Sequence, residues 1–240
     1  MSCGCHLKLE SGVAMFTRYA IYYTPAPGTP LAEFGARWLG WDSARGVTLP
    51  PLAAEGLDVA QITARPRNYG FHGTIKPPFR LADGATAQGL SDAVETLCAD
   101  AAPVHLQGLK LARLGRFLAL VPAGDATALA TLAARAVQEL DGFRAPASEA
   151  ELARRRTARL SAAQDMHLLR WGYPHVLDQF RFHLTLTGPL DQHVAAQAER
   201  ALAAPIAALD LAPYAITGLT LLGEDHSGRF QQIHRYTLTG

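Results

Sequence analysis

Two segments of this chain, 111 residues apart, repeat one pattern of eleven residues. Residues 69–79 read Tyr-Gly-Phe-His-Gly-Thr-Ile-Lys-Pro-Pro-Phe, and residues 180–190 read Phe-Arg-Phe-His-Leu-Thr-Leu-Thr-Gly-Pro-Leu. On a β-strand alternate residues share a face, so each segment predicts a strand with one apolar side and one His-Thr side. A single His-x-Thr is weak evidence, but two copies inside a longer match indicate a duplicated structural unit.

Two such strands that face one cleft bring two imidazoles and two hydroxyls around one small anion. An imidazole titrates near neutral pH, so one can remove a proton in its neutral form while the other donates a proton in its charged form. We therefore predict His72 and His183 as the catalytic pair of a phosphodiester cleavage, and Thr74 and Thr185 as phosphate ligands. The alternative is a pair of duplicated strands whose histidines only make structural hydrogen bonds.

Other residues are candidates for the walls of the same cleft. Strand alternation places Lys76 and Arg181 on the His-Thr side, where we expect them to bind phosphate oxygens. Four further residues are expected in a lid or pocket wall: Tyr69, Arg155, Trp171 and Tyr173. The competing interpretations are a hydrated cleft rim for the cations, a solvated helix face for the arginines and ordinary packing for the aromatic rings.

The paired motifs resemble the two-histidine (2H) phosphoesterase superfamily, which includes bacterial 2′-5′ RNA ligase-like proteins and cyclic nucleotide phosphodiesterases. The segments at 18–25, 69–72, 151–156, 170–174 and 180–188 are similar to a bacterial subgroup of unknown function, often encoded beside phosphonate-utilisation genes. The resemblance runs from about Arg18 to the C-terminus. It implies a phosphoesterase that needs no metal or other cofactor, acting on a cyclic or 2′-linked phosphodiester in phosphonate metabolism.

The residue pattern predicts an α+β fold with two pseudo-symmetric lobes that face a central cleft, each a mainly antiparallel sheet with outer helices. Each half reads strand, helix, His-x-Thr strand, helix, strand, and the prolines at 77–78 should end the first His-x-Thr strand. We expect one bilobal domain over 15–240, with lobes interleaved in sequence and a helical insertion at about 145–175. The expected strands are 18–24, 104–112, 116–121, 214–222 and 231–238, and the expected helices begin near 30, 86, 126, 148, 161 and 191.

Composition limits the partners. The net charge of +1 argues against a long nucleic-acid track and against DNA, and no apolar run approaches membrane length. We expect a small phosphorylated metabolite or nucleotide as ligand, with short RNA as an alternative, and a monomer in the cytoplasm. Residues 1–14 are expected to be a disordered leader, and their Cys3-Gly4-Cys5-His6 run lacks the second cysteine pair typical of a zinc site.

Two other functions fit the same motifs. A non-catalytic module that holds RNA ends or a phosphorylated metabolite would use the threonines and cations without needing both histidines. A 2′-5′ RNA ligase would use the same site in the reverse direction. The sequence has no H-E-x-x-H, Walker or G-x-G-x-x-G pattern, so it indicates neither a metallohydrolase nor a nucleoside triphosphate enzyme.

Overall fold

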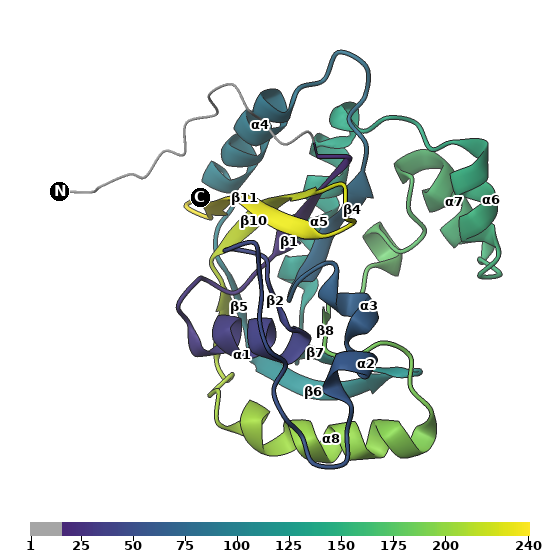
Figure 1. Ribbon diagram of the computed structural model, residues 1–240. Helices are drawn as coiled ribbons and strands as arrows, with labels where there is room; N and C mark the ends of the chain where they lie inside the picture. Colours follow the sequence, from purple (N-terminus) through teal and green to yellow (C-terminus); the bar gives the residue numbers. More distant parts are fainter. Residues whose placement is uncertain (1–15) are drawn as a thin grey trace.

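The computed structural model describes residues 16–240, and the predicted leader with its Cys3-Gly4-Cys5-His6 run lies outside these residues. The fold is α+β, as predicted, and its centre is one seven-stranded antiparallel sheet in the order β11-β10-β1-β4-β8-β7-β6 (Figure 1). The strands are β1 (Arg18–Tyr23), β2 (Trp41–Asp42), β3 (Val47–Thr48), β4 (Gly73–Phe79), β5 (Val104–Leu106), β6 (Gly108–Leu114), β7 (Phe117–Ala123), β8 (Leu184–Thr185), β9 (Tyr214–Ile216), β10 (Gly218–Glu224) and β11 (Phe230–Thr237). The α-helices are α1 (Pro30–Leu39), α2 (Val59–Ile62), α3 (Ala64–Arg67), α4 (Ala87–Ala99), α5 (Thr127–Glu139), α6 (Glu149–Arg156), α7 (Ala162–Trp171) and α8 (Gln192–Ala207), with 3₁₀ turns at Asp141–Phe143 and Leu177–Gln179.

The two halves of the sequence exchange strands. Strand β6 ends the first half of the chain, yet it pairs with β7 of the second half. Strand β10 belongs to the second half, and it pairs with β1 of the first. The short strands β5 and β9, which also correspond between the halves, pair with each other. Strands from the two halves of the sequence therefore alternate across the sheet.

The halves join where the two His-x-Thr strands meet. Strands β4 and β8 are antiparallel neighbours, and Gly73 pairs with Leu184. The Phe182 ring lies against Gly73. The Cβ of any larger residue at position 73 would stand only 2.3 Å from Phe182 Cε2. Glycine at 73 thus allows the two lobes to approach each other closely. This contact makes one continuous sheet of the two predicted ones.

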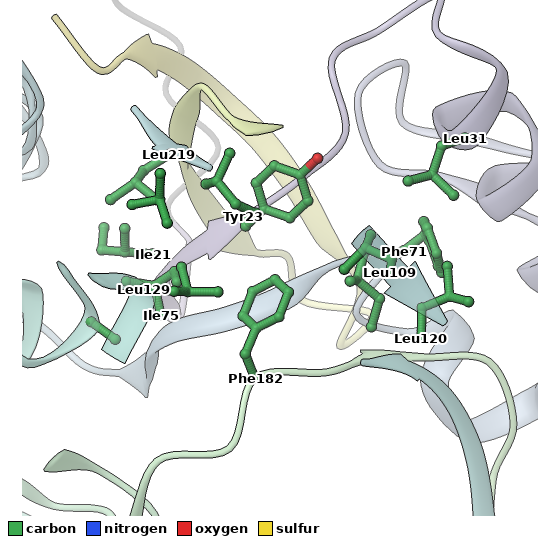
Figure 2. Close-up of a cluster of buried hydrophobic side chains, with 14 of the residues drawn as sticks. Ile21, Tyr23, Leu31, Phe71, Ile75, Leu109, Leu120, Leu129, Phe182 and Leu219 are labelled. Atoms are coloured by element: carbon green, nitrogen blue, oxygen red, sulfur yellow. The ribbon is translucent and has the colours of Figure 1, made fainter. Parts of the chain in front are cut away.

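One hydrophobic cluster underlies both halves, and Figure 2 shows Ile21, Ile75 and Phe182 within it. Helices α4 and α5 pack against the first half of the sheet, and α8 packs against β6 and β7 at the opposite end (Figure 1). Apolar residues at helical spacing explain this packing, as in α5, where Leu129, Leu132 and Ala136 are buried. On the opposite, His-Thr side, a small cluster of Ala20, Tyr22, Leu222 and Phe230 is buried, and the histidines and threonines of the two motifs are half-buried.

The predicted insertion forms α6 and α7, which project from the body beside β4 (Figure 1). Both helices begin with the expected capping boxes, at Ser148 with Glu151 and at Ser161 with Gln164. Arg144 fixes the insertion to the body, since its guanidinium binds Asp141 and the Arg170 carbonyl. No helix between residues 16 and 240 is long and apolar enough to cross a bilayer.

The lengths of the two His-x-Thr strands differ from the expectation. Strand β4 continues through the prolines at 77–78 to Phe79, because its pairing with β1 shifts register there and that irregular ladder requires no N–H donor from them. Strand β8 contains only Leu184 and Thr185, and residues 180–183, which join it to the 3₁₀ turn at Leu177–Gln179, have no regular secondary structure.

Candidate active site

The two His-x-Thr motifs line one cavity of about 540 Å³. His72 and Thr74 enter it from the first motif, and His183 and Thr185 enter it from the second. Their neighbours in sequence, Gly73 and Leu184, are turned toward the buried side of the sheet. The alternation predicted for each strand therefore places two imidazoles and two hydroxyls in one space.

The β4–β8 register sets the order of these four groups. Because Gly73 opposes Leu184 in an antiparallel pair, the pairing continued by one residue places His72 beside Thr185 and Thr74 beside His183. Each imidazole thus has a hydroxyl from the other motif across the strand boundary. This arrangement is nearly two-fold symmetric.

Both histidines are held by the same backbone contact. His72 Nδ1 lies 2.9 Å from the Gly70 carbonyl oxygen, and His183 Nδ1 lies 2.7 Å from the Arg181 carbonyl oxygen. A carbonyl only accepts, so each Nδ1 carries a proton and donates it. In the neutral tautomer Nε2 is then the basic atom. Thr74 Oγ1 lies 3.2 Å from His72 Nε2, where it donates to that atom.

The surroundings of His72 favour its neutral form. Its ring stacks on Tyr22 with 3.8 Å between ring centroids. Burial lowers the pKa of His72 to about 4, and the neighbouring His183 adds to this effect, although the Gly70 hydrogen bond opposes it. A neutral His72 at pH 7 is suited to accept a proton. His183 instead lies beside the Phe117 ring, with 5.5 Å between centroids.

Four arginines line the same cavity: Arg18, Arg65, Arg154 and Arg155. No Asp or Glu is among the described residues that line it. Arg18 is oriented by Glu224, which accepts from both Nε and Nη2. The Arg155 guanidinium lies over the Tyr173 ring, 4.9 Å from the centroid. The cavity is therefore strongly cationic although the chain is nearly neutral.

Three predicted wall residues lie where the sequence placed them. Tyr69, Arg155 and Tyr173 all line the cavity. Trp171 does not, since it lines a separate small cavity on the other side of Tyr173. There its ring stacks with the Arg170 guanidinium, 4.6 Å from the centroid.

The position predicted for Lys76 is wrong. Ile21 opposes Lys76 while Tyr22 opposes Thr74, so Ile75 is an extra residue in β4 and Lys76 lies on the same buried side as Ile75. The Lys76 side chain is consequently buried, and its Nζ donates to the Val137 carbonyl at 2.9 Å. Lys76 is absent from the walls of the two-histidine cavity.

Arg181 also lies outside the cavity walls. Strand alternation does not extend to it, because β8 begins only at Leu184. Its Nη1 donates to the Phe180 carbonyl at 2.7 Å and more weakly to the Asp178 carbonyl. The contribution of Arg181 to the site is its own backbone carbonyl, which holds His183.

Our sequence reasoning missed several cavity residues: Arg18, Tyr22, Arg65 and Phe117. A signal existed for two of them, because Arg18 and Tyr22 are four residues apart on one strand and therefore share a face. Arg65 and Phe117 reach the cavity from a short helix and a neighbouring strand, which only the tertiary structure brings together. Within residues 16–240, no three His, Cys, Asp or Glu side chains are grouped to hold a metal ion.

The chain is similar to curated proteins in sequence and to solved structures in fold. Curated relatives named "Ribose 1,5-bisphosphate phosphokinase PhnN" are 38% identical over 223 residues in Janthinobacterium sp. (strain Marseille) and 37% identical over 177 residues in Laribacter hongkongensis (strain HLHK9). These alignments cover 88% and 73% of this chain but 48% and 41% of the relatives, so the chain spans about half their length.

Among solved structures, "Crystal structure of phosphoesterase" is 18% identical with a TM-score of 0.40, and E. coli LigT complexed with 3′-AMP is 16% identical with a TM-score of 0.41. Each comparison covers 94% of this chain and 99% of the other. A family model described as "Protein of unknown function (DUF1045)" matches residues 74–231. This match agrees with the bacterial subgroup of unknown function that the motifs resemble, and the chain belongs to the DUF1045 family.

Proposed function

We propose that this protein is a phosphoesterase that opens a cyclic phosphodiester, or cleaves a 2′-linked one, by two-histidine acid–base catalysis. The observation that supports it most directly is the shared cavity of His72 and His183, with a proton on each Nδ1 and with each Nε2 left for chemistry. The reaction requires one group that accepts a proton and one that donates. Two imidazoles in one cavity supply both.

His72 is the better candidate for the base. In hydrolysis its Nε2 takes a proton from water as the water oxygen forms a bond to phosphorus. The bond from phosphorus to the leaving ribose oxygen breaks, and a protonated His183 gives that oxygen its Nε2 proton. Burial lowers the pKa of His72, so its imidazole is neutral at pH 7 and its Nε2 can accept a proton.

The threonines stabilise the charge that develops on phosphate. Thr74 and Thr185 line the cavity beside the two imidazoles, so their hydroxyls are available to the non-bridging oxygens. Thr74 donates to His72 Nε2 when no ligand is bound. On substrate binding that hydroxyl turns to the phosphate and leaves Nε2 free for the water.

The names of the curated relatives suggest a different activity, a phosphokinase. That activity belongs to proteins about twice as long as the matched region. The present sequence lacks the glycine-rich phosphate loop with which many kinases bind ATP. We therefore propose phosphoester cleavage here, and we place it in phosphonate metabolism on the strength of the subgroup resemblance.

The direct test is turnover of defined diesters, followed by ³¹P NMR. We would incubate the protein with a nucleoside 2′,3′-cyclic phosphate, a nucleoside 3′,5′-cyclic phosphate and a 2′-5′-linked dinucleotide. Conversion of a cyclic or 2′-linked diester to a monoester supports the proposal. Saturable binding without turnover of any diester would favour the binding module, and formation of a 2′-5′ bond from RNA ends would favour the ligase.

A further inference from the structure

The cationic part of the cavity is larger than one phosphate needs. Arg18 and Tyr22 lie on the same face of β1, four residues apart, and Tyr22 stacks on His72. Four residues of strand span roughly 13 Å at 3.3 Å per residue. The Arg18 backbone is therefore set back by that distance from Tyr22, the residue that stacks on His72.

The insertion supplies the other side of this cationic region. Arg155 comes from α6, and its Nε is buried without a hydrogen-bond partner among the described residues. Burial lowers the pKa of Arg155. Tyr173 and Glu151 oppose this effect, whereas the positive charges of Arg154 and Arg18 add to it, so the three guanidiniums act on one another. Like charges held together in a partly buried site are costly unless an anion compensates them.

The local carboxylates compensate this cluster only in part. Glu224 binds Arg18 through Nε and Nη2, which leaves Nη1 without a bond in the described part of the chain. Glu151, on the same helix as Arg155, receives the Arg80 guanidinium at 3.6 Å and completes the capping box. Tyr173 gives Arg155 a ring face and no negative charge.

We propose that Arg155, together with Arg18 and Arg154, binds a second phosphate of the substrate. This inference rests on the proposed function and narrows its substrate class: a small sugar or nucleoside cyclic phosphodiester that also carries a phosphomonoester. The histidines and threonines hold the reacting diester, and the arginines hold the spectator phosphate. The insertion has no counterpart in the first half of the chain, so it breaks the symmetry of the cavity and fixes the direction in which substrate binds.

The test compares two substrates that differ only in the second phosphate: adenosine 2′,3′-cyclic phosphate and its 5′-phosphorylated form. A charge-assisted contact contributes about 1.5–3 kcal/mol, which corresponds to roughly 10- to 100-fold in kcat/KM. We expect the protein to prefer the 5′-phosphorylated form by at least this factor. Arg155→Gln should remove most of the preference, because kcat/KM should fall much further for the 5′-phosphorylated form than for the unphosphorylated form.

A matched control lies one residue further along the same helix. Arg156 is exposed, pairs with Asp165 and does not line the cavity. Arg156→Gln should keep the preference for the 5′-phosphorylated substrate. Equal kcat/KM values for the two substrates in the wild-type protein would overturn the inference, as would an equal loss for both in Arg155→Gln.

A binding measurement separates this inference from the proposed reaction. Calorimetric titration with adenosine 2′-monophosphate and adenosine 2′,5′-bisphosphate needs no turnover. Tighter binding of the bisphosphate, lost in Arg155→Gln, supports the second phosphate site even if no diester is cleaved. If the protein cleaves cyclic phosphates but binds adenosine 2′-monophosphate and adenosine 2′,5′-bisphosphate equally well, the proposed reaction is supported and the second phosphate site is ruled out.

Discussion

The Phe182 ring occupies the space in which a side chain at residue 73 would stand. Each of these residues is next to a cavity histidine in sequence, so their contact couples lobe docking to the spacing of the two histidines. Gly73→Ala places a Cβ 2.3 Å from Phe182 Cε2, and the neighbouring strands must move. We expect a loss of about 1–3 kcal/mol in the free energy of unfolding, measured by urea titration.

A second glycine serves as the control for that substitution. A Cβ at Gly142 meets nothing within 4 Å. Gly142→Ala should change the free energy of unfolding by less than about 0.5 kcal/mol. If Gly73→Ala is as stable as Gly142→Ala, the tight contact between Gly73 and the Phe182 ring is contradicted.

The pH dependence of catalysis should reflect the buried imidazole. The pKa of His72 is lowered to about 4, and the base must be neutral, so kcat/KM should fall only as the pH drops through about 4. Bound phosphate raises the pKa of an adjacent imidazole, and the acid limb of kcat should therefore lie at higher pH than that of kcat/KM. If kcat and kcat/KM both fall with an acid limb near pH 6.5, the assignment of His72 as a buried base is wrong.

Linkage gives the same histidine a measurable effect on folding. Its pKa is lower in the folded state than the unperturbed value of about 6.5, so the folded state disfavours protonation. The contribution of His72 to stability is full above about pH 6.5 and is lost as the pH falls toward 4. His72→Gln should flatten the dependence of unfolding free energy on pH in this window, and an unchanged slope would count against the shifted pKa.

The hydroxyls can be removed with little change of shape. Thr74→Val or Thr185→Val deletes one donor near the developing charge, and removal of such a donor has cost roughly 10²- to 10³-fold in kcat elsewhere. We expect a fall in kcat of at least about 10-fold for each, with a smaller change in KM. A change confined to KM would assign the threonines to ground-state binding alone.

The reaction should not depend on a divalent ion, because two imidazoles already supply both proton transfers. Activity measured after dialysis against EDTA should equal the untreated activity within error. Activity lost on chelation and restored by one divalent ion would replace the proposed mechanism.

The sequence predicted the parts of the site that depend on the alternation of side chains along one short strand. His72 and Thr74 are two residues apart, as are His183 and Thr185, and each pair lines the cavity. Alternation failed at Lys76, because a register shift between β1 and β4 is set by the neighbouring strand rather than by the segment itself. It failed at Arg181 because the strand is only two residues long.

The strand exchange also required the structure. The sequence predicted two similar halves, but which strand of each half joins the other half depends on tertiary contacts between distant residues. The grouping of arginines in the cavity also depends on tertiary contacts between distant residues. Arg18 and Arg155 are far apart in sequence, and only the tertiary structure brings them to the walls of one cavity.

The central claim is that the two histidines act as one unit on one phosphate, and a double-mutant cycle in kcat tests it most directly. For a cyclic phosphate that the protein hydrolyses, His72→Ala and His183→Ala should each lower kcat by roughly 10²- to 10⁴-fold. Groups that share one proton transfer are non-additive, so the double variant should lose less than the product of the two single effects. Unchanged kcat in either single variant, or a double variant whose loss equals that product, would contradict the account.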